Sequence, residues 1–267
     1  MSDVYLFGHP VGHSLSPAMH NAAFKALGLP HRYGARDVEP GGLSDVILRL
    51  RREDALGANV TIPHKEATAH LVDEVVEDAR AIGAVNTIVR RGSRLIGHNT
   101  DAYGFERSLG DGLSAGRVLL LGAGGGARAC ALVLLRRGLA VDVASRTRAR
   151  AEELARSIES DGRRATAVEW PARGTALPQA AVVNATPLGL AGEDPLAGIA
   201  LPRVVVDIVP TREETPLVRR AREAQDVVVV DGLSMLLHQA ARSFELWTGV
   251  PAPLEVMRAA LLLERPV

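Results

Sequence analysis

The stretch RVLLLGAGGGAR, residues 117–128, constrains the fold of this chain more than any other feature of its sequence. A short aliphatic run, typical of a buried parallel strand, ends in a glycine-rich turn that leads into a helical pattern. Gly122 fits the tight turn of a dinucleotide fingerprint, Gly124 the point where a pyrophosphate approaches, and Ala127 the small third position. A flexible turn is the alternative interpretation, but the order strand, loop, helix favours a dinucleotide site.

Short aliphatic or β-branched runs alternate with helical segments along the rest of the chain, which predicts an α/β fold with mostly parallel sheets. Before the glycine loop the pattern includes a helix over residues 17–27, the strand GANVTI and a helix over residues 64–79. The polar, glycine-rich stretch 97–116 separates this series from the next, so we place a domain boundary soon after Asp101. Two α/β domains would then face each other across a cleft.

The next predicted strand, AVDVAS, indicates which dinucleotide would bind. A domain that binds NAD places an acidic residue at the end of this strand for the ribose hydroxyls. Here the strand leads into Ser145, Arg146 and Thr147, and Arg150 follows, so positive charge is available for the 2′-phosphate of NADP. A solvated helix start is the weaker interpretation, because cations at a helix N-terminus are unfavourable without an anion. Asp142 lies earlier in the strand, and we interpret it as an edge or packing position.

The composition excludes several classes of function. Lys and Arg number 31 and Asp and Glu also 31, so the chain lacks the basic excess of a nucleic-acid or anionic-membrane binder. No basic segment precedes an apolar stretch at the N-terminus, and the apolar runs are too short to span a bilayer. We therefore expect a cytoplasmic protein with a small-molecule substrate, no nucleic-acid or membrane partner, and a homodimer as one possible assembly. The single Cys130 and the spacing of the eight histidines predict no metal site.

Ser16 and Pro17 begin a predicted helix that Gly28 ends. Ser16 as the N-cap is the simplest interpretation, because serine before proline is a common helix start. The N-terminus of a helix is also an anion site, so Ser14 and Ser16 could receive a carboxylate through hydroxyls and backbone N–H groups. The two roles are compatible.

Polar residues also mark the ends of two strands in the first half. Asn59 and Thr61 share one face of the strand GANVTI, and Lys65 follows in the first turn of a helix. A solvated surface lysine is the ordinary expectation there. However, Asn86 starts another strand and Asp101 follows in a loop, and parallel α/β sheets gather such residues along one edge. We therefore expect five side chains to converge in a set that suits a hydroxylated acid. They are Ser14, Thr61, Lys65, Asn86 and Asp101.

Eight motifs in this order resemble the shikimate dehydrogenase family across essentially the whole chain: SLSP, ANVTIPHK, GAVNT, NTD, GAGGGAR, SRT, NATPLG and DGLSMLLHQA. The resemblance implies a substrate-binding domain over residues 1–101, completed by C-terminal helices over residues 233–267. It also implies a Rossmann-type NADP-binding domain over residues 102–232. The implied activity is the reversible reduction of 3-dehydroshikimate to shikimate by NADPH.

The resemblance also implies roles for individual residues. It assigns the substrate carboxylate to Ser14 and Ser16, and a catalytic pair to Lys65 and Asp101. The ring hydroxyls would lie near Thr61, Asn86, Asp101 and Gln239. Cofactor contacts would include Glu77, Gly122, Ala123, Gly124, Gly125, Gly126, Ser145, Arg146, Thr147, Arg150, Thr186, Ile208 and Gly232. From the sequence alone, Thr186 could be a turn residue and Gln239 an ordinary residue of an amphipathic helix.

Three positions depart from the family pattern, and the mildest is Ser145, which replaces a frequent asparagine. Pro210 stands where members usually carry a substrate-contacting tyrosine, and Ser234 stands where glycine is common. These departures leave open a related enzyme that acts on quinate or on aminoshikimate. A dinucleotide-binding sensor without catalytic activity is the alternative from a different class, and the presence of both Lys65 and Asp101 argues against it.

Overall fold

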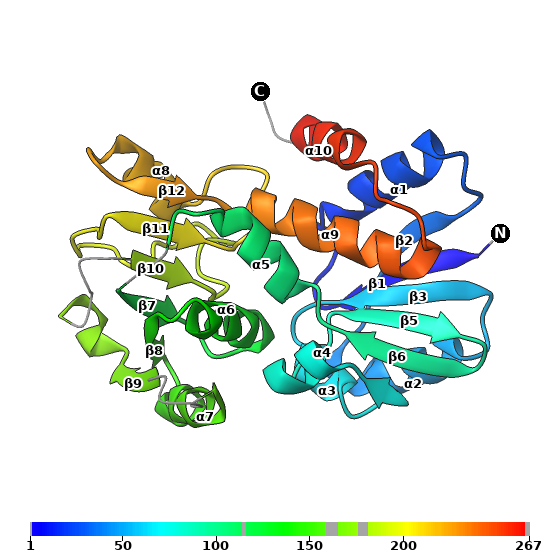
Figure 1. The fold of residues 1–267 in the computed structure, drawn as a ribbon, viewed down its shortest axis with the longest axis horizontal. Helices are drawn as coiled ribbons and strands as arrows, with labels where there is room; N and C mark the ends of the chain where they lie inside the picture. Colours follow the sequence, from blue (N-terminus) through cyan, green and yellow to red (C-terminus); the bar gives the residue numbers. More distant parts are fainter. Residues whose placement is uncertain (1, 114–115, 159–164, 176–180, 265–267) are drawn as a thin grey trace. The chain divides into compact units, whose positions relative to one another are not determined.

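The structure is a computed structural model that describes residues 2–113, 116–158, 165–175 and 181–264. The chain divides into two compact units, one of Met1–Gly104 with Leu237–Val267 and the other of Phe105–Leu236. Each unit contains a six-stranded sheet with helices packed on it (Figure 1). The α/β fold class predicted from the alternating pattern is confirmed. Residues 265–267 of the predicted C-terminal helical segment lie outside the described residues.

The sheet of the first unit is mixed, with the strand order β2-β1-β3-β5-β6-β4. Strand β1 pairs in parallel with β2 and with β3, whereas β5 runs antiparallel to both β3 and β6. Buried aliphatic and aromatic side chains of this sheet pack against helix α2 in one continuous core. The strands are β1 Asp3–Gly8, β2 Arg32–Asp37, β3 Ala55–Val60, β4 Glu74–Val75, β5 Thr87–Arg91 and β6 Arg94–His98.

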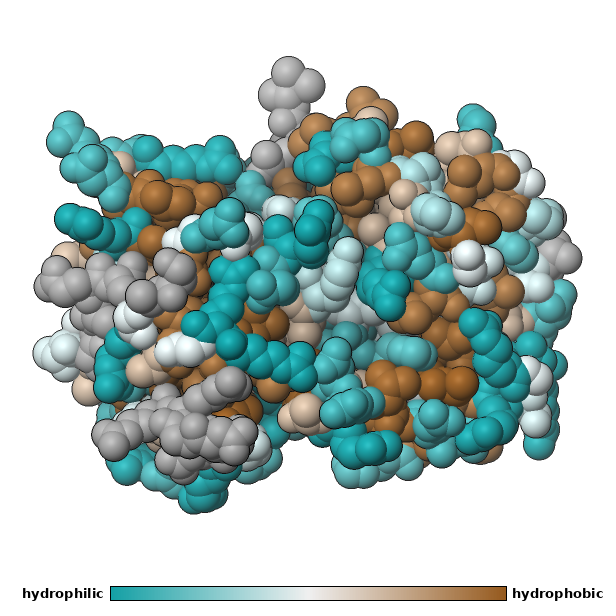
Figure 2. Space-filling model, viewed as in Figure 1, coloured by the Kyte–Doolittle hydropathy of each residue, from teal (hydrophilic) through white to brown (hydrophobic). Residues whose placement is uncertain are grey.

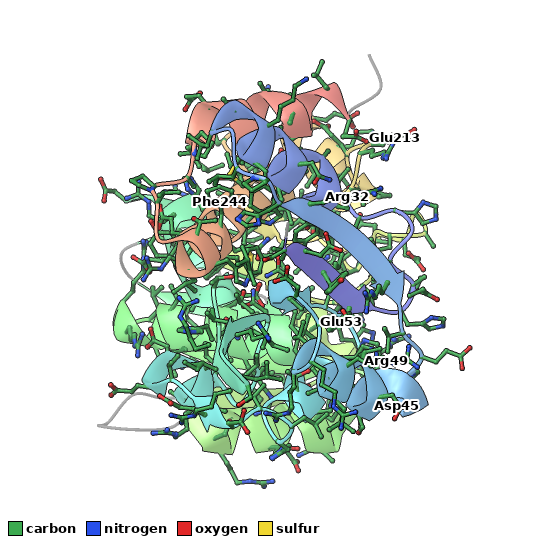
Figure 3. The ribbon with its side chains drawn as sticks, turned by 90° about the vertical axis from the view of Figure 1, so that its right-hand side faces the viewer. Arg32, Asp45, Arg49, Glu53, Glu213 and Phe244 are labelled. Carbon is green, nitrogen blue, oxygen red and sulfur yellow. The ribbon has the colours of Figure 1, made fainter. Side chains whose placement is uncertain are left out.

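Helices of the first unit come from both ends of the chain. Helix α1 contacts α10, although more than two hundred residues separate them in sequence, and the two lie side by side in Figure 1. In Figure 3, Phe244 is labelled on α9, where its ring packs 5.1 Å from that of Phe24 on α1. The helices are α1 Ser16–Ala26, α2 Leu43–Leu50, α3 Lys65–Thr68, α4 Glu77–Ile82, the part of α9 (Gly232–Thr248) from Leu237 onward, and α10 Leu254–Leu263, with a 3-10 turn at Pro40–Gly42.

The helix predicted over residues 64–79 is wrong, because two short helices and a strand occupy this region. Helix α3 ends at Thr68, and the chain then pairs with β6 through β4. Asp73 fixes this arrangement, since its Oδ2 accepts the N–H of Leu95 at 2.7 Å and its own N–H donates to Leu95 O at 3.0 Å. Tertiary pairing of the β-branched residues that follow α3 therefore overrides local helix propensity.

Helix α5, Asp101–Leu109, occupies part of the polar stretch that the sequence marks as a boundary, so the prediction that Asp101 lies in a loop is wrong. Asn99 caps its start, because Asn99 Oδ1 accepts the N–H of Asp101 at 3.0 Å and that of Ala102 at 3.4 Å. Helix α9 is anchored near its C-terminal end, where Trp247 Nε1 donates to Ile88 O of β5 at 2.9 Å. Both helices thereby place polar residues at the site described below.

The sheet of the second unit is entirely parallel, with the strand order β12-β11-β10-β7-β8-β9. Its four central strands, β7, β8, β10 and β11, are short, mostly aliphatic runs that are largely buried, as is usual for parallel sheets covered by helices. The strands are β7 Arg117–Leu121, β8 Ala140–Ser145, β9 Ala165–Glu169, β10 Ala181–Asn184, β11 Val204–Asp207 and β12 Val228–Val230. The helices are α6 Gly125–Arg136, α7 Arg148–Ile158 and α8 Pro216–Glu223, with a 3-10 turn at Pro171–Gly174.

The surface carries both polar and apolar residues. Figure 2 shows hydrophobic residues over α10, the helix in which Leu262 and Leu263 are exposed. Among the described residues, no helix combines the length and hydrophobicity needed to cross a membrane.

Candidate active site

Lys65 and Asp101 form an ion pair in the first unit. Each is the first residue of a helix, and Lys65 Nζ donates to Asp101 Oδ2 at 2.6 Å. The lysine side chain is 16% exposed and the aspartate side chain 6%. Partial burial strengthens such a pair, because less solvent screens the two charges. The lysine is thus held beside a carboxylate instead of extending into solvent.

Asn86 holds the other oxygen of this carboxylate. Its Nδ2 donates to Asp101 Oδ1 at 2.9 Å, and its Oδ1 accepts the main-chain N–H of Thr100 at 2.7 Å. A main-chain N–H can only donate, so this contact fixes which end of the amide faces Asp101. Gln239 of α9 lies beside it, with 3.4 Å between Asn86 Nδ2 and Gln239 Oε1. The structure therefore brings together the predicted residues Lys65, Asn86, Asp101 and Gln239.

The start of α1 differs from the predicted cap. Leu15 occupies the N-cap position and no side chain caps the helix, so the N-cap prediction for Ser16 is wrong. The Ser16 N–H donates to Ser14 Oγ at 3.3 Å, which keeps the two serines together. The physical reason for the missing cap is that Ser16 is already the first helical residue, so its buried side chain lies past the cap position.

Thr61 follows directly after β3 and is partly buried. Its N–H donates to Phe7 O at 2.8 Å, and its carbonyl accepts the N–H of His64 at 2.9 Å. The buried His64 ring is fixed in turn by a 2.6 Å hydrogen bond between its Nε2 and Val38 O. These contacts hold the tight turn that connects Thr61 to Lys65.

Sequence reasoning missed a cluster of buried polar side chains next to Asn86. Asn59, Thr87, Thr100 and Ser243 come from β3, β5, the segment before α5, and α9. The hydroxyls of Thr87 and Ser243 are 2.8 Å apart, and Asn59 Nδ2 lies 3.0 Å from Thr87 Oγ1 and 3.1 Å from Ser243 Oγ. The motifs ANVT, GAVNT and NTD contain three of these residues, but helical periodicity alone gives no sign that Ser243 faces them.

His20 of α1 is fully buried, and within the described residues neither ring nitrogen has a hydrogen-bond partner. The ring stacks on that of Tyr33 at 4.4 Å between centroids and lies 5.3 Å from that of Trp247. Burial lowers the pKa of His20 to about 3, because the charged ring would lose its hydration. His20 is therefore neutral near pH 7 and serves as a packing residue.

The predicted cofactor residues of the second unit lie along one edge of its sheet. The strands are parallel, so the segments after β7, β8, β10, β11 and β12 leave the sheet at the same edge. Ligands of such sheets bind at this edge, where the strand order reverses, which here is between β7 and β10. The residues at this edge are Gly122, Ala123, Gly124, Gly125, Gly126, Ser145, Arg146, Thr147, Arg150, Thr186, Ile208 and Gly232.

The glycine loop fits a pyrophosphate. Gly122 has a φ of +110°, and a Cβ there would lie 2.8 Å from Ala185 O, so a larger residue would be strained. A Cβ on Gly124 would meet no atom within 4 Å, which leaves the backbone open to a ligand. Helix α6 starts at Gly125, and its first N–H groups have no acceptor within the helix. Such N–H groups and the helix dipole attract phosphate.

The basic turn after β8 fits a 2′-phosphate. Arg146, Thr147 and Arg150 are exposed there, and the N–H of Thr147 donates to Ser145 Oγ at 3.3 Å. Asp142, the acidic residue of this strand, is buried and pairs with Arg117, with Nη1 and Oδ1 2.6 Å apart. The packing interpretation of Asp142 is therefore confirmed, and its carboxylate does not lie at the end of the strand.

Asp207 organises the loops after β10 and β11, which is a role that sequence reasoning missed. Its carboxylate accepts hydrogen bonds from Asn184 Nδ2 at 2.9 Å, from Thr215 Oγ1 at 2.6 Å and from the N–H of Val209 at 3.2 Å. Asn184 Oδ1 in turn accepts from Thr186 Oγ1 at 2.7 Å. Burial raises the pKa of Asp207 to about 6, although these hydrogen bonds oppose the shift.

Glu77, the remaining predicted cofactor residue, lies in the first turn of α4, in the first unit. Across the described part of the chain, no three His, Cys, Asp or Glu side chains are grouped so that they could hold a metal ion.

Comparison with known protein families gives two matches. Residues 6–88 match the shikimate dehydrogenase substrate binding domain, and residues 232–262 match the shikimate 5′-dehydrogenase C-terminal domain. The first match contains Ser14, Ser16, Thr61, Lys65 and Asn86, and the second contains Gln239.

Individual relatives match nearly the whole chain. A shikimate dehydrogenase (NADP(+)) from Symbiobacterium thermophilum is 46% identical, with 96% of this chain and 92% of the relative covered. The solved structure of shikimate 5-dehydrogenase from Thermus thermophilus in complex with NADP(H) and shikimate is 38% identical, with a TM-score of 0.85 and coverage of 99% and 100%. Quinate dehydrogenase from Corynebacterium glutamicum in complex with NAD is 32% identical, with a TM-score of 0.84 and coverage of 98% and 99%.

Proposed function

Because the chain belongs to the shikimate dehydrogenase family, we propose that it catalyses the reversible reduction of 3-dehydroshikimate to shikimate with NADPH. Membership of this family makes it an NADP-dependent oxidoreductase. The observation that carries the proposed reaction is the Lys65–Asp101 ion pair, with Asn86 on the second carboxylate oxygen. NADPH, when bound, supplies the hydride, and the protein supplies orientation and a proton.

Lys65 is the proposed proton carrier. Reduction of a ketone produces an alkoxide that needs a proton, and a protonated amine can give this proton and take it back in the reverse reaction. The chain contains only two lysines, Lys25 and Lys65, among its 31 Lys and Arg residues. Arginine stays protonated in proteins and could not exchange the proton, which explains a lysine at this position. The Asp101 carboxylate orients the amine.

The remaining polar residues of the first unit are assigned to the substrate. Ser14 and Ser16, adjacent at the start of α1, would receive the carboxylate, since hydroxyls and N–H groups at a helix start favour an anion. Thr61, Asn86, Asp101 and Gln239 would bind the ring hydroxyls, because their side chains offer both donors and acceptors. We accordingly assign substrate binding to residues 1–101 with 233–267, and NADP binding to residues 102–232.

The edge of the parallel sheet is assigned to the cofactor. The loop Gly122–Gly126 would bind the pyrophosphate, and Ser145, Arg146, Thr147 and Arg150 the 2′-phosphate. Asp207 and Asn184 hold the loop that carries Thr186, so they would act as positioning residues for this side of the site. Glu77, Ile208 and Gly232 are assigned as cofactor contacts by the family resemblance alone.

A substrate screen tests this proposal. Absorbance at 340 nm is followed with shikimate, quinate and aminoshikimate, each with NADP and with NAD. We expect the highest kcat/KM with shikimate and NADP. A preference for quinate, which Pro210 and the similarity to a quinate dehydrogenase would favour, would assign the chain to the related activity instead. Absence of turnover with all six combinations of substrate and cofactor would favour a dinucleotide-binding sensor without catalytic activity.

Two further assignments come from the sequence. We propose a cytoplasmic location and a homodimer as the assembly to test. Light scattering coupled to size-exclusion chromatography measures the mass in solution against the 28.3 kDa of one chain.

A further inference from the structure

We propose that Thr87 and Ser243 are positioning residues, whose buried hydroxyls hold Asn86 and through it the Lys65–Asp101 pair. This inference rests on the proposed function, because it concerns how the assigned catalytic pair is aligned. Neither side chain is exposed, and both lie one step behind the residues assigned to the substrate.

The hydroxyl of Thr87 acts directly on Asn86. Thr87 Oγ1 donates to Asn86 Oδ1 at 3.0 Å, the same oxygen that accepts the N–H of Thr100. Thr87 therefore adds a second restraint on the end of the amide that faces away from Asp101. Since Asn86 Nδ2 donates to Asp101 Oδ1, a rotated amide would present an oxygen to the carboxylate and repel it.

Ser243 connects this restraint to the C-terminal helix. Its oxygen lies 2.8 Å from Thr87 Oγ1 and 3.0 Å from the carbonyl oxygen of Gln239. A hydroxyl has one proton, and the proton of Thr87 goes to Asn86 Oδ1, so Ser243 is the donor to Thr87. The oxygen of Ser243 in turn accepts from Thr100 Oγ1 at 3.0 Å and from Asn59 Nδ2 at 3.1 Å. One hydroxyl on α9 thus ties together strands β3 and β5 and the segment before α5.

The same network reaches β2. Asn59 Oδ1 accepts the hydroxyl of Tyr33 at 2.8 Å. Burial raises the pKa of Tyr33, so its phenol stays protonated and remains a donor. A continuous chain of hydrogen bonds therefore links Tyr33 to Asp101 within the first unit. Buried networks of this kind hold geometry well only when every member is satisfied.

The substitutions Thr87→Val and Thr87→Ser separate positioning from packing. Valine keeps the shape and removes the hydroxyl, whereas serine keeps the hydroxyl and removes a methyl group. We expect Thr87→Val to lower kcat for shikimate about 10- to 100-fold, in line with the cost of small misalignments, and Thr87→Ser to stay within about 3-fold of the parent. A pure packing role predicts the reverse order, because serine leaves the larger cavity.

Ser243→Ala is the second variant, and Thr248→Val is its matched control. Thr248 lies on the same helix with its hydroxyl 2.8 Å from Phe244 O, as that of Ser243 lies 3.0 Å from Gln239 O, but outside the network. We expect Ser243→Ala to lower kcat about 10-fold and Thr248→Val to leave kcat within about 2-fold, at similar changes in melting temperature. The loss of kcat in the double variant Thr87→Val/Ser243→Ala should be smaller than the product of the two single losses, because both substitutions break the same Thr87–Ser243 contact.

Two outcomes overturn the positioning role. One is a near-parental kcat in Thr87→Val and Ser243→Ala, and the other is an equal loss in Thr87→Val and Thr87→Ser. If Thr87→Val does not fold, the comparison of Ser243→Ala with Thr248→Val decides. Failure of the proposed function would be seen separately, as absence of shikimate turnover in the parent enzyme.

Discussion

Lys65 and Asp101 are 36 residues apart in sequence, yet Lys65 Nζ and Asp101 Oδ2 lie 2.6 Å apart. Each starts a helix, and Asn86 holds the carboxylate oxygen that the lysine does not use. The contact is built within the first unit, from side chains of α3, α5 and the segment before β5. A general acid held in this way is ready to act without reorganisation.

Lys65→Ala should lower kcat by about 10²- to 10⁴-fold, the usual contribution of general acid–base catalysis, and change the KM for shikimate much less. Lys65→Arg should fail almost equally, because arginine keeps the charge but cannot release a proton. Steady-state kinetics with shikimate and NADP measure both variants. Lys25→Ala, which removes the other lysine of the chain, is the control. A near-parental kcat with a raised KM in Lys65→Ala would make Lys65 a binding residue.

Arg146→Ala should raise the KM for NADP much more than the KM for NAD. A charge-assisted contact with phosphate contributes about 1.5 to 3 kcal/mol, which corresponds to roughly one to two decades in affinity. Arg148→Ala is a matched control two residues away, since Arg148 is also exposed but pairs with Glu152 and Glu169. Equal effects of Arg146→Ala on the KM values for NADP and NAD would show that Arg146 does not bind the 2′-phosphate.

Pro210→Tyr should lower the KM for shikimate about 2- to 10-fold, because a neutral hydrogen bond contributes about 0.5 to 1.5 kcal/mol. Pro210 is exposed in the loop after β11, so the larger side chain does not have to enter the core. Pro210→Phe adds the same ring without the hydroxyl and should not reproduce the gain. If Pro210→Tyr instead loses activity on shikimate while the parent prefers another polyol acid, the related activity is the correct assignment.

His20→Phe should make the protein less sensitive to acid. The pKa of His20 is lowered to about 3 in the folded state from 6.5, so below about pH 6.5 the unfolded chain binds the proton and the folded protein does not. Stability is therefore lost as the pH falls from about 6.5 toward about 3. The unfolding free energy of the variant minus that of the parent should therefore be about 2 kcal/mol larger at about pH 4.5 than at about pH 6.5.

Urea unfolding at several pH values measures this difference. The dependence of the unfolding free energy on pH decides the result. Replacing a buried imidazole with a phenyl ring also changes the packing, but this shifts the unfolding free energy by the same amount at every pH. Parallel curves for parent and variant would show that His20 takes up its proton equally well in the folded state.

The sequence by itself determined the α/β class, the glycine loop and the basic turn. These features are local, because a strand, a turn and a helix start are specified by neighbouring residues. Gly122 and Gly124 are recognisable for this reason, as is the position of Arg146 after β8.

Only the tertiary structure decided which polar side chains meet. The segment after α3 became a strand instead of more helix because Asp73 and its neighbours pair with β6. Ser243 reads as an ordinary helical residue, yet it lies 2.8 Å from Thr87 because α9 is anchored on β5 through Trp247. A hydrogen bond requires a partner within about 3 Å, and for buried residues distant in sequence that partner is set by packing and not by local propensity.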